Sequence, residues 1–164
     1  MSINCTDVIL HHRIFKRCYK KIAKIEKHRI FCRHDMNHFL DVARLMMILQ
    51  LKEKWSVQYS DEIVYATALL HDIGRHLQYK KKIPHEVASA KIAAKVLKDC
   101  VFTDSERNLI IEAILNHRNA KVVGKQDLNS LLYRADKMSR PCFCCKAEPY
   151  CNWDKAKKNL QIKY

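Results

Sequence analysis

Residues 66–75 read Ala66-Thr-Ala-Leu-Leu-His-Asp-Ile-Gly-Arg75, an apolar run that ends in an adjacent histidine and aspartate. The run is typical of a buried helix, and Ser60 is placed to cap its start. A buried carboxylate such as Asp72 is costly unless it is paired or binds a cation. An imidazole beside a carboxylate at a helix end, where side chains converge, therefore indicates a metal-binding nucleus. The pair alone is weak evidence, because it arises by chance in many proteins.

Other polar residues occupy similar positions elsewhere in the chain, on or beside apolar helical faces. Each comes from a different predicted helix: His38, His85, His117 and Asp136. Taken singly, His117 is explained by a favourable place at a helix C-terminus and His85 by a place early in a helix. Only the ordered set of six, with His71 and Asp72, outweighs these plain explanations.

The ordered set resembles the HD-domain metal-dependent phosphohydrolase superfamily, whose pattern is H…HD…D on a helical bundle. The resemblance covers roughly residues 30–140 and includes the local strings Ala-Leu-Leu-His-Asp-Ile-Gly-Arg and Tyr-Arg-Ala-Asp-Lys-Met-Ser-Arg. It implies four core metal ligands: His38, His71, Asp72 and Asp136. His85 and His117 match two further histidines of its two-metal branches, which include symmetrical diadenosine tetraphosphate hydrolases and cyclic dinucleotide phosphodiesterases. The Gly-Tyr-Pro segment of the latter is absent, so that activity is not expected.

Imidazole and carboxylate ligands suit divalent Fe, Mn, Co, Ni or Zn. Our hypothesis is that Asp72 bridges two such ions, one completed by His38, His71 and Asp136 and the other by His85 and His117. Two ions of this kind bind a phosphate oxygen and activate a water. We therefore expect a metal-dependent phosphohydrolase that acts on a phosphate ester or anhydride, in a nucleotide or related small molecule. His34, although it forms an H-x-x-x-H pair with His38, is interpreted as a supporting or helix-start residue.

Two other functions remain open at this point. One is a non-catalytic module that senses a nucleotide or binds nucleic acid through the same pocket. The other, a weaker alternative, is a di-iron oxygenase, because some members of the superfamily oxidise their substrates. The six filled ligand positions favour the enzyme, since a sensor need not retain a full metal set.

Positive charge dominates the chain, with 31 Lys and Arg against 17 Asp and Glu, a formal charge of +14 and a pI near 9.5. Such a balance favours anionic partners. We expect Arg75 and Arg118 to bind substrate phosphates and to act with Asp72 in catalysis, and Lys137 to contact substrate. The basic face of an amphipathic helix predicted over residues 6–28 is either solvated or a surface for nucleic acid or acidic lipid.

The fold class follows from composition and periodicity. The 164 residues include two glycines and three prolines, too few for the turns of a sandwich or barrel. We predict an all-α HD-type bundle of about six or seven helices over residues 1–140. Helices are expected at residues 6–28, 34–51, 61–71, 84–97, 103–117 and 127–138, with a capping box at Thr103 and Glu106 and a loop at 75–83. His11, His12, His28 and His76 are expected to be solvated.

Residues 141–164 form a cysteine-rich tail. Its thiols, Cys142, Cys144, Cys145 and Cys151, are candidates for a structural zinc site or an iron–sulfur centre, with free thiols as the alternative. Eight cysteines without an export signal indicate a reducing compartment, so we expect a cytoplasmic protein. No apolar run approaches the roughly 18 residues of a membrane span.

Overall fold

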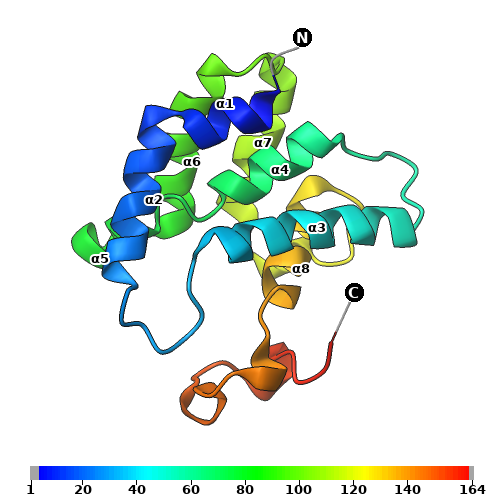
Figure 1. Ribbon diagram of the computed structural model, residues 1–164. Helices are drawn as coiled ribbons and strands as arrows, with labels where there is room; N and C mark the ends of the chain where they lie inside the picture. The colour runs from blue at the N-terminus through cyan, green and yellow to red at the C-terminus, as the bar shows by residue number, and fades with distance from the viewer. Residues whose placement is uncertain (1–3, 163–164) are drawn as a thin grey trace.

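The computed structural model describes residues 4–162. These residues form helices and connecting segments with no strand among them, which confirms the all-α prediction (Figure 1). Residues 1–3 of the predicted helical region and residues 163–164 of the predicted tail lie outside the described part. The helices are α1 Cys5–His11, α2 Arg13–Ile25, α3 Met36–Lys52, α4 Asp61–Leu70, α5 Arg75–Lys81, α6 His85–Val96, α7 Asp104–Asn116 and α8 Leu128–Met138.

The core lies between α3, α4, α6, α7 and α8, and α1 and α2 add buried residues such as Ile9 and Phe15 to it. Helix α3 packs against α4 and α8, and α7 packs against α4, α6 and α8. Phe39, Val42 and Met46, which share one face of α3, are buried, while Leu45 beside them is half-buried. Within the described residues, no helix is long and apolar enough to cross a membrane.

Several helix starts are fixed by side-chain caps, as the sequence predicts. The Ser60 hydroxyl accepts a hydrogen bond from the Ile63 amide at the start of α4. Thr103 and Glu106 form the predicted capping box of α7. Asp35 and Asp127 cap α3 and α8 in the same way, each accepting a bond from the third amide of its helix. These caps set where the helices that carry the candidate ligands begin.

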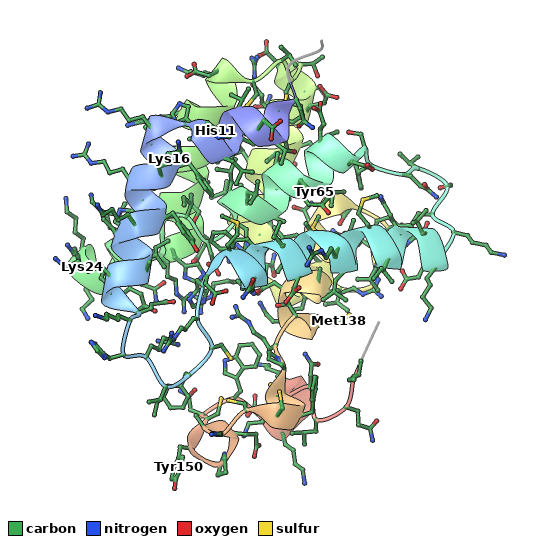
Figure 2. The ribbon with its side chains drawn as sticks, in the orientation of Figure 1. His11, Lys16, Lys24, Tyr65, Met138 and Tyr150 are labelled. Carbon is green, nitrogen blue, oxygen red and sulfur yellow. The ribbon has the colours of Figure 1, made fainter. Side chains whose placement is uncertain are left out.

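The single helix predicted over residues 6–28 is wrong, because the chain turns at His12. The His12 backbone is extended, with φ −63° and ψ 132°, and its Nδ1 accepts a bond from the Ile14 amide. Its Nε2 also lies 3.1 Å from Asp99 Oδ2, so this half-buried histidine is not simply solvated. The turn lets α1 pack on α4 while α2 packs on α5 and α6. Figure 2 shows Lys16 and Lys24 of the basic face extending away from α2.

The loop predicted at residues 75–83 is also wrong, because residues 75–81 form α5. Its last turn ends at Lys82, which has a left-handed backbone with φ 58°. His76, expected to be solvated, is buried on α5, with its Nδ1 3.2 Å from the Ile73 carbonyl oxygen. Gly74 begins α5 rather than ending α4, and its importance lies in a close approach to α6.

The tail packs against the end of α8 through short 3-10 turns (Figure 1). The Asn159 side chain is buried and donates hydrogen bonds to the Lys137 carbonyl at 2.6 Å and the Arg140 carbonyl at 3.1 Å. Lys158 donates to Glu148 Oε1 at 2.8 Å. These bonds hold the tail beside the helix that carries Asp136.

Candidate metal centre

All six predicted ligands come together in one buried cluster. Within the described residues, two sets place their ligand atoms within 4.8 Å of one another: His38, His71, Asp72 and Asp136, and Asp72, His85 and His117. All members of both sets are buried. This division between two sets is the one that the two-ion hypothesis requires.

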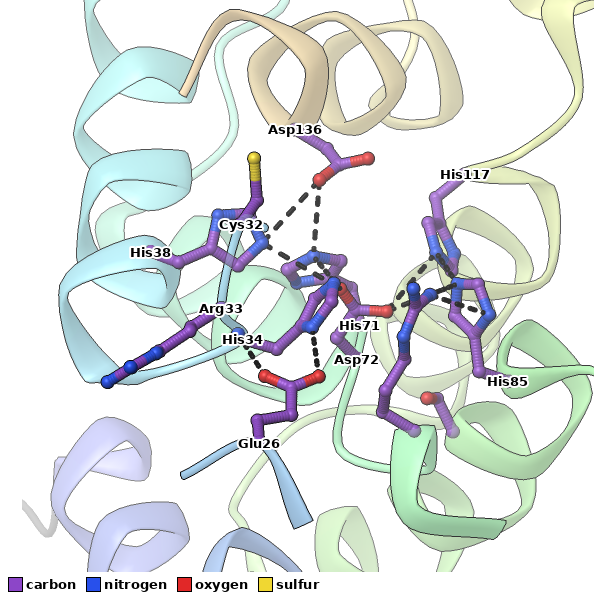
Figure 3. Close-up of polar contacts among 12 residues, drawn as sticks. Glu26, Cys32, Arg33, His34, His38, His71, Asp72, His85, His117 and Asp136 are labelled. Atoms are coloured by element: carbon purple, nitrogen blue, oxygen red, sulfur yellow. Dashed lines mark hydrogen bonds and ion pairs between the residues drawn. The ribbon is translucent and has the colours of Figure 1, made fainter. Parts of the chain in front are cut away.

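Asp72 belongs to both sets, and its two oxygens face in different directions (Figure 3). Oδ2 lies 3.3 Å from His71 Nε2 and 3.7 Å from His38 Nε2. Oδ1 lies 3.2 Å from His85 Nε2 and 3.7 Å from His117 Nε2. The carboxylate is therefore placed to bridge two cations.

The ligands converge because they lie at helix ends that meet. His71 and His117 are the C-terminal cap residues of α4 and α7, and His85 is the first residue of α6. Gly74 allows α6 to approach the turn after α4, and its amide donates to Ser89 Oγ at 2.9 Å. A Cβ at Gly74 would lie 2.6 Å from the Ala88 carbonyl carbon. This contact between backbones brings His85 to Asp72.

Each of the four candidate histidines has an oxygen partner at Nδ1. His71 Nδ1 donates to the Ala68 carbonyl at 2.7 Å, and His117 Nδ1 donates to the Ile114 carbonyl at 2.6 Å. His38 Nδ1 lies 3.1 Å from Ser139 Oγ, and His85 Nδ1 is bonded to Gln78 Oε1. A carbonyl oxygen accepts only, so the Nδ1 atoms of His71, His85 and His117 carry a proton. In the neutral form of each imidazole, Nε2 then has a lone pair for a metal.

Burial and charge set the protonation states of the cluster. Burial lowers the pKa of His38 and of His85 to about 3, so both imidazoles are neutral. Burial alone would lower the pKa of His71, but the adjacent Asp72 and Asp136 carboxylates raise it. Burial opposes ionisation of Asp72 and Asp136, yet the neighbouring imidazole and cations hold both pKa values well below the usual range. Both carboxylates are therefore ionised and can act as metal ligands.

Two buried atoms of the cluster, His71 Nε2 and Asp72 Oδ1, have no hydrogen-bond partner. Buried polar atoms are rarely left unpaired. Nitrogen and carboxylate oxygen atoms are also the donors that Fe, Mn, Co, Ni and Zn accept. The residues present therefore fit divalent metal ions.

Arg140 is a site residue that the sequence reasoning missed. Its side chain is buried, and Nη2 lies 3.1 Å from Asp136 Oδ1 and 3.2 Å from His38 Nε2. The sequence contains an indication of this contact, because Arg140 follows Asp136 by four residues, a spacing at which two side chains meet on a helix. Ser139 and Gln78, which hold His38 and His85, carry no comparable signal.

Glu26 and His34 form a supporting pair beside the cluster. Glu26 accepts bonds from the His34 amide at 2.7 Å, from His34 Nδ1 at 2.6 Å and from the Tyr79 hydroxyl at 2.6 Å. Burial would raise the pKa of Glu26, but these bonds outweigh burial and lower it to about 2. His34 Nε2 in turn lies 3.5 Å from Asp72 Oδ2. His34 thus supports Asp72, and the Glu26 carboxylate that holds His34 is itself buried.

A cavity of about 460 Å³ opens onto the cluster. The predicted substrate residues Arg75, Arg118 and Lys137 all line it. Arg75 Nη1 lies 3.0 Å from His85 Nδ1, and Lys137 Nζ pairs with Asp136 Oδ2. Arg118 is the most open of the three, with 55% of its side chain exposed and its Nη1 3.6 Å from Glu86 Oε2.

The tail thiols lie apart from this cluster. Cys144 is exposed, Cys145 and Cys151 are half-buried, and Cys142 is buried. Neither of the two sets of close ligand atoms in residues 4–162 includes a cysteine. A metal centre in the tail stays a prediction.

The chain is similar to known proteins in sequence and to a solved structure in fold. An uncharacterized protein of Clostridium beijerinckii is 43% identical over 145 residues, which cover 88% of this chain and 89% of that protein. Ribonuclease Y of Enterococcus faecalis is 24% identical over 150 residues, covering 92% of this chain but 26% of that protein. The crystal structure of a predicted HD superfamily hydrolase from an uncultured Thermotogales bacterium shares the fold, with a TM-score of 0.64 at 19% identity. That match covers 96% of this chain and 88% of the other.

A family comparison covers the part of the chain that holds the candidate ligands. Residues 36–140 match the HD domain family, and this range contains all six of them. The match confirms the resemblance seen in the sequence, and the chain belongs to the HD domain family.

Proposed function

We propose that this protein is a metal-dependent phosphohydrolase that cleaves a phosphate ester or anhydride, in a nucleotide or related small molecule. The observation that carries the proposal is the position of Asp72, whose two oxygens face two separate sets of histidine ligands. A carboxylate placed to bridge two cations, in a cavity that is also lined by arginine and lysine, supports hydrolysis of a bound phosphate.

The residues assigned to the ions follow from the two sets. One ion would be held by His38, His71, Asp72 and Asp136, and the other by Asp72, His85 and His117. When bound, Fe, Mn, Co, Ni or Zn ions supply Lewis acidity toward a phosphate oxygen and lower the pKa of a bound water.

The surrounding arginines bind and orient the anion. The Nε–H groups of Arg75 and Arg140 are buried and have no hydrogen-bond partner. Both side chains line the cavity, so each has a donor available for a phosphate oxygen. Lys137 and Arg118 add positive charge farther along the wall. This distribution favours a substrate with more than one anionic oxygen.

Ribonuclease Y is named for cleavage of RNA, which is a phosphodiester. The likeness supports including short RNA oligonucleotides among the substrates to be tested. The basic face of α2 remains a candidate surface for nucleic acid, and phosphate-driven binding there should weaken steeply with salt. We retain the cytoplasmic location as part of the proposal, on the cysteine content of the chain.

The test is hydrolysis of a panel of phosphoesters, nucleotides and short RNAs by the metal-stripped protein. Mn, Fe(II), Co, Ni and Zn are added back singly, with and without oxygen. Turnover is expected only with metal, and it should be lost in Asp72→Ala. The matched control is Asp41→Asn, whose side chain is half exposed on α3 and pairs with Arg44. Metal binding by a folded protein without turnover would favour the sensing module, and strict oxygen dependence would favour the oxygenase.

A further inference from the structure

Cys32 lies beside the tail cysteines. The metal site predicted for the tail did not include this residue. Cys32 belongs to the loop between α2 and α3, which descends on the same side of the bundle as residues 141–162 (Figure 1). Cys32 lines the site cavity together with Cys142 and Cys151. It also lines a neighbouring cavity of about 290 Å³ together with Cys144 and Cys145. A loop residue separated by more than a hundred positions thus meets the tail cysteines.

Three of the tail thiols, Cys142, Cys145 and Cys151, act electrostatically on Cys32. Burial is the main cause that raises the pKa of the Cys32 thiol, and charges on Cys142, Cys145 and Cys151 raise it further, against the opposing effect of Arg140. Cys144 differs from these three thiols in its exposure. Its thiol is exposed and donates to the Pro141 carbonyl of its own turn, at 3.5 Å.

The backbone of the tail gives two of these thiols a compact arrangement. Cys142–Cys144 is a 3-10 turn, and the Cys145 amide donates to the Cys142 carbonyl at 3.2 Å. The turn closes the C-x-x-C segment, a spacing common in structural zinc sites. Cys151 follows the next 3-10 turn, Glu148–Tyr150. Cys142 is buried and the other three thiols are half-buried, as suits ligands shielded from solvent.

We propose that Cys32, Cys142, Cys145 and Cys151 bind one zinc ion, and that Cys144 is not a ligand. Four thiolates around zinc form the closed tetrahedral set of a structural site, with Zn–S distances of about 2.3 Å. Among the described residues, no three of the sulfurs yet lie within 4.8 Å of one another. Closure therefore requires the four side chains to turn toward a common point, which the metal itself would drive.

Such a site would link the tail to the loop between α2 and α3, and both segments line the site cavity. The tail contributes Trp153 and Lys157 to the lining of that cavity, and Cys142 and Cys151 line it directly. Without the ion, the tail is held to α8 chiefly by the buried Asn159 side chain. The role of the zinc is structural, and this proposal is independent of which substrate the HD centre cleaves.

The experiment compares Cys32→Ser with Cys144→Ser in the full chain, purified under reducing conditions and reconstituted with Co(II). Thiolate-to-cobalt charge-transfer absorption reports sulfur ligands and is blind to the His and Asp centre. The band is expected at full strength in the wild type and in Cys144→Ser, and it should fall severalfold in Cys32→Ser. Loss in Cys144→Ser with retention in Cys32→Ser, or no band in the wild type, would overturn the proposal. Acid-labile sulfide, which marks an iron–sulfur centre, would also overturn it.

Thiol alkylation of the wild-type chain tests the same ligand set without a variant. With zinc bound, Cys32, Cys142, Cys145 and Cys151 should be protected together, while Cys144 is modified at the same rate with and without chelator. Rapid modification of Cys32 in the zinc-loaded protein contradicts its place in the site. Peptide mass mapping gives the rate at each position.

Discussion

Arg140 Nη2 donates a hydrogen bond of 3.1 Å to Asp136 Oδ1, inside the candidate metal centre. The same nitrogen lies 3.2 Å from His38 Nε2, so one guanidinium contacts two ligands of the same set. Its Nε–H is buried without a hydrogen-bond partner, and the Arg140 side chain lines the site cavity. Arg140 is therefore placed both to orient Asp136 and to meet an incoming phosphate.

Replacement of Arg140 by glutamine should weaken turnover of a phosphorylated substrate. Hydrogen bonds between charged groups contribute about 1.5–3 kcal/mol, so kcat/KM should fall about 10- to 100-fold, mainly through a higher KM. Steady-state kinetics on the best substrate of the panel measures the change. Arg44→Gln is the matched control, because Arg44 is largely exposed and pairs only weakly with Asp41. An unaltered kcat/KM would remove Arg140 from the site.

Arg75 should contribute more than Arg118 to phosphate binding. Arg75 Nη1 lies 3.1 Å from His85 Nε2 and its Nε–H is buried and unpaired, whereas the Arg118 side chain is 55% exposed. Solvent screens the charge of an exposed group, which weakens its pull on an anion. The loss of kcat/KM in Arg75→Ala should therefore be at least tenfold greater than the loss in Arg118→Ala. A tenfold difference corresponds to about 1.4 kcal/mol. Equal losses in the two variants would contradict this order.

The buried Glu26 should make stability depend on pH. Its pKa is about 2 in the folded chain against an ordinary 4.5, so its stabilising effect is complete above pH 4.5. That effect is lost as the pH falls toward 2, because the carboxylate is then protonated in both states. Linkage sets its size on the order of 3 kcal/mol. Urea unfolding of wild type and Glu26→Gln, both metal-free, should show a gap that closes below pH 4.5.

A control variant separates this effect from general charge removal. Glu112 is exposed on α7, so Glu112→Gln should change the free energy of unfolding by less than about 0.5 kcal/mol at every pH. A gap between wild type and Glu26→Gln that stays constant from pH 7 to pH 3 would show that the Glu26 charge is not the cause.

Gly74→Ala should destabilise the protein and disturb the second ligand set. The added Cβ would lie 2.6 Å from the Ala88 carbonyl carbon and 2.7 Å from the Ala88 Cβ, and it would also meet the Ser89 amide. Overpacking of this kind costs about 1–3 kcal/mol or more, and here it pushes α6 and His85 away from Asp72. Thermal unfolding and metal titration measure the two effects.

Gly124→Ala provides the comparison for that variant. Gly124 has open space around its Cβ position but a left-handed backbone, with φ +92°. Only backbone strain of about 1 kcal/mol is expected there, with no change in metal binding. If Gly74→Ala behaves like Gly124→Ala, the close approach of α6 is not what places His85.

The sequence by itself determined the helical class, most helix starts and the six candidate ligands. Caps act within one turn, so Ser60 and Thr103 are readable locally. The ligands are readable because a histidine or aspartate on an apolar helical face is costly without a partner. The strings around His71 and Asp136 resemble those of the HD domain family and suggested the order of the ligands, and residues 36–140 match that family.

Only the tertiary structure decided which residues support these ligands and which cysteines meet. The sequence indicated no role for Glu26, yet the fold buries it against His34 and Tyr79. Cys32 reaches the tail because the α2–α3 loop lies beside it, a contact across more than a hundred residues. Periodicity and capping report interactions within a few residues of one another. Contacts between distant segments depend on how the helices pack, and no local pattern records that.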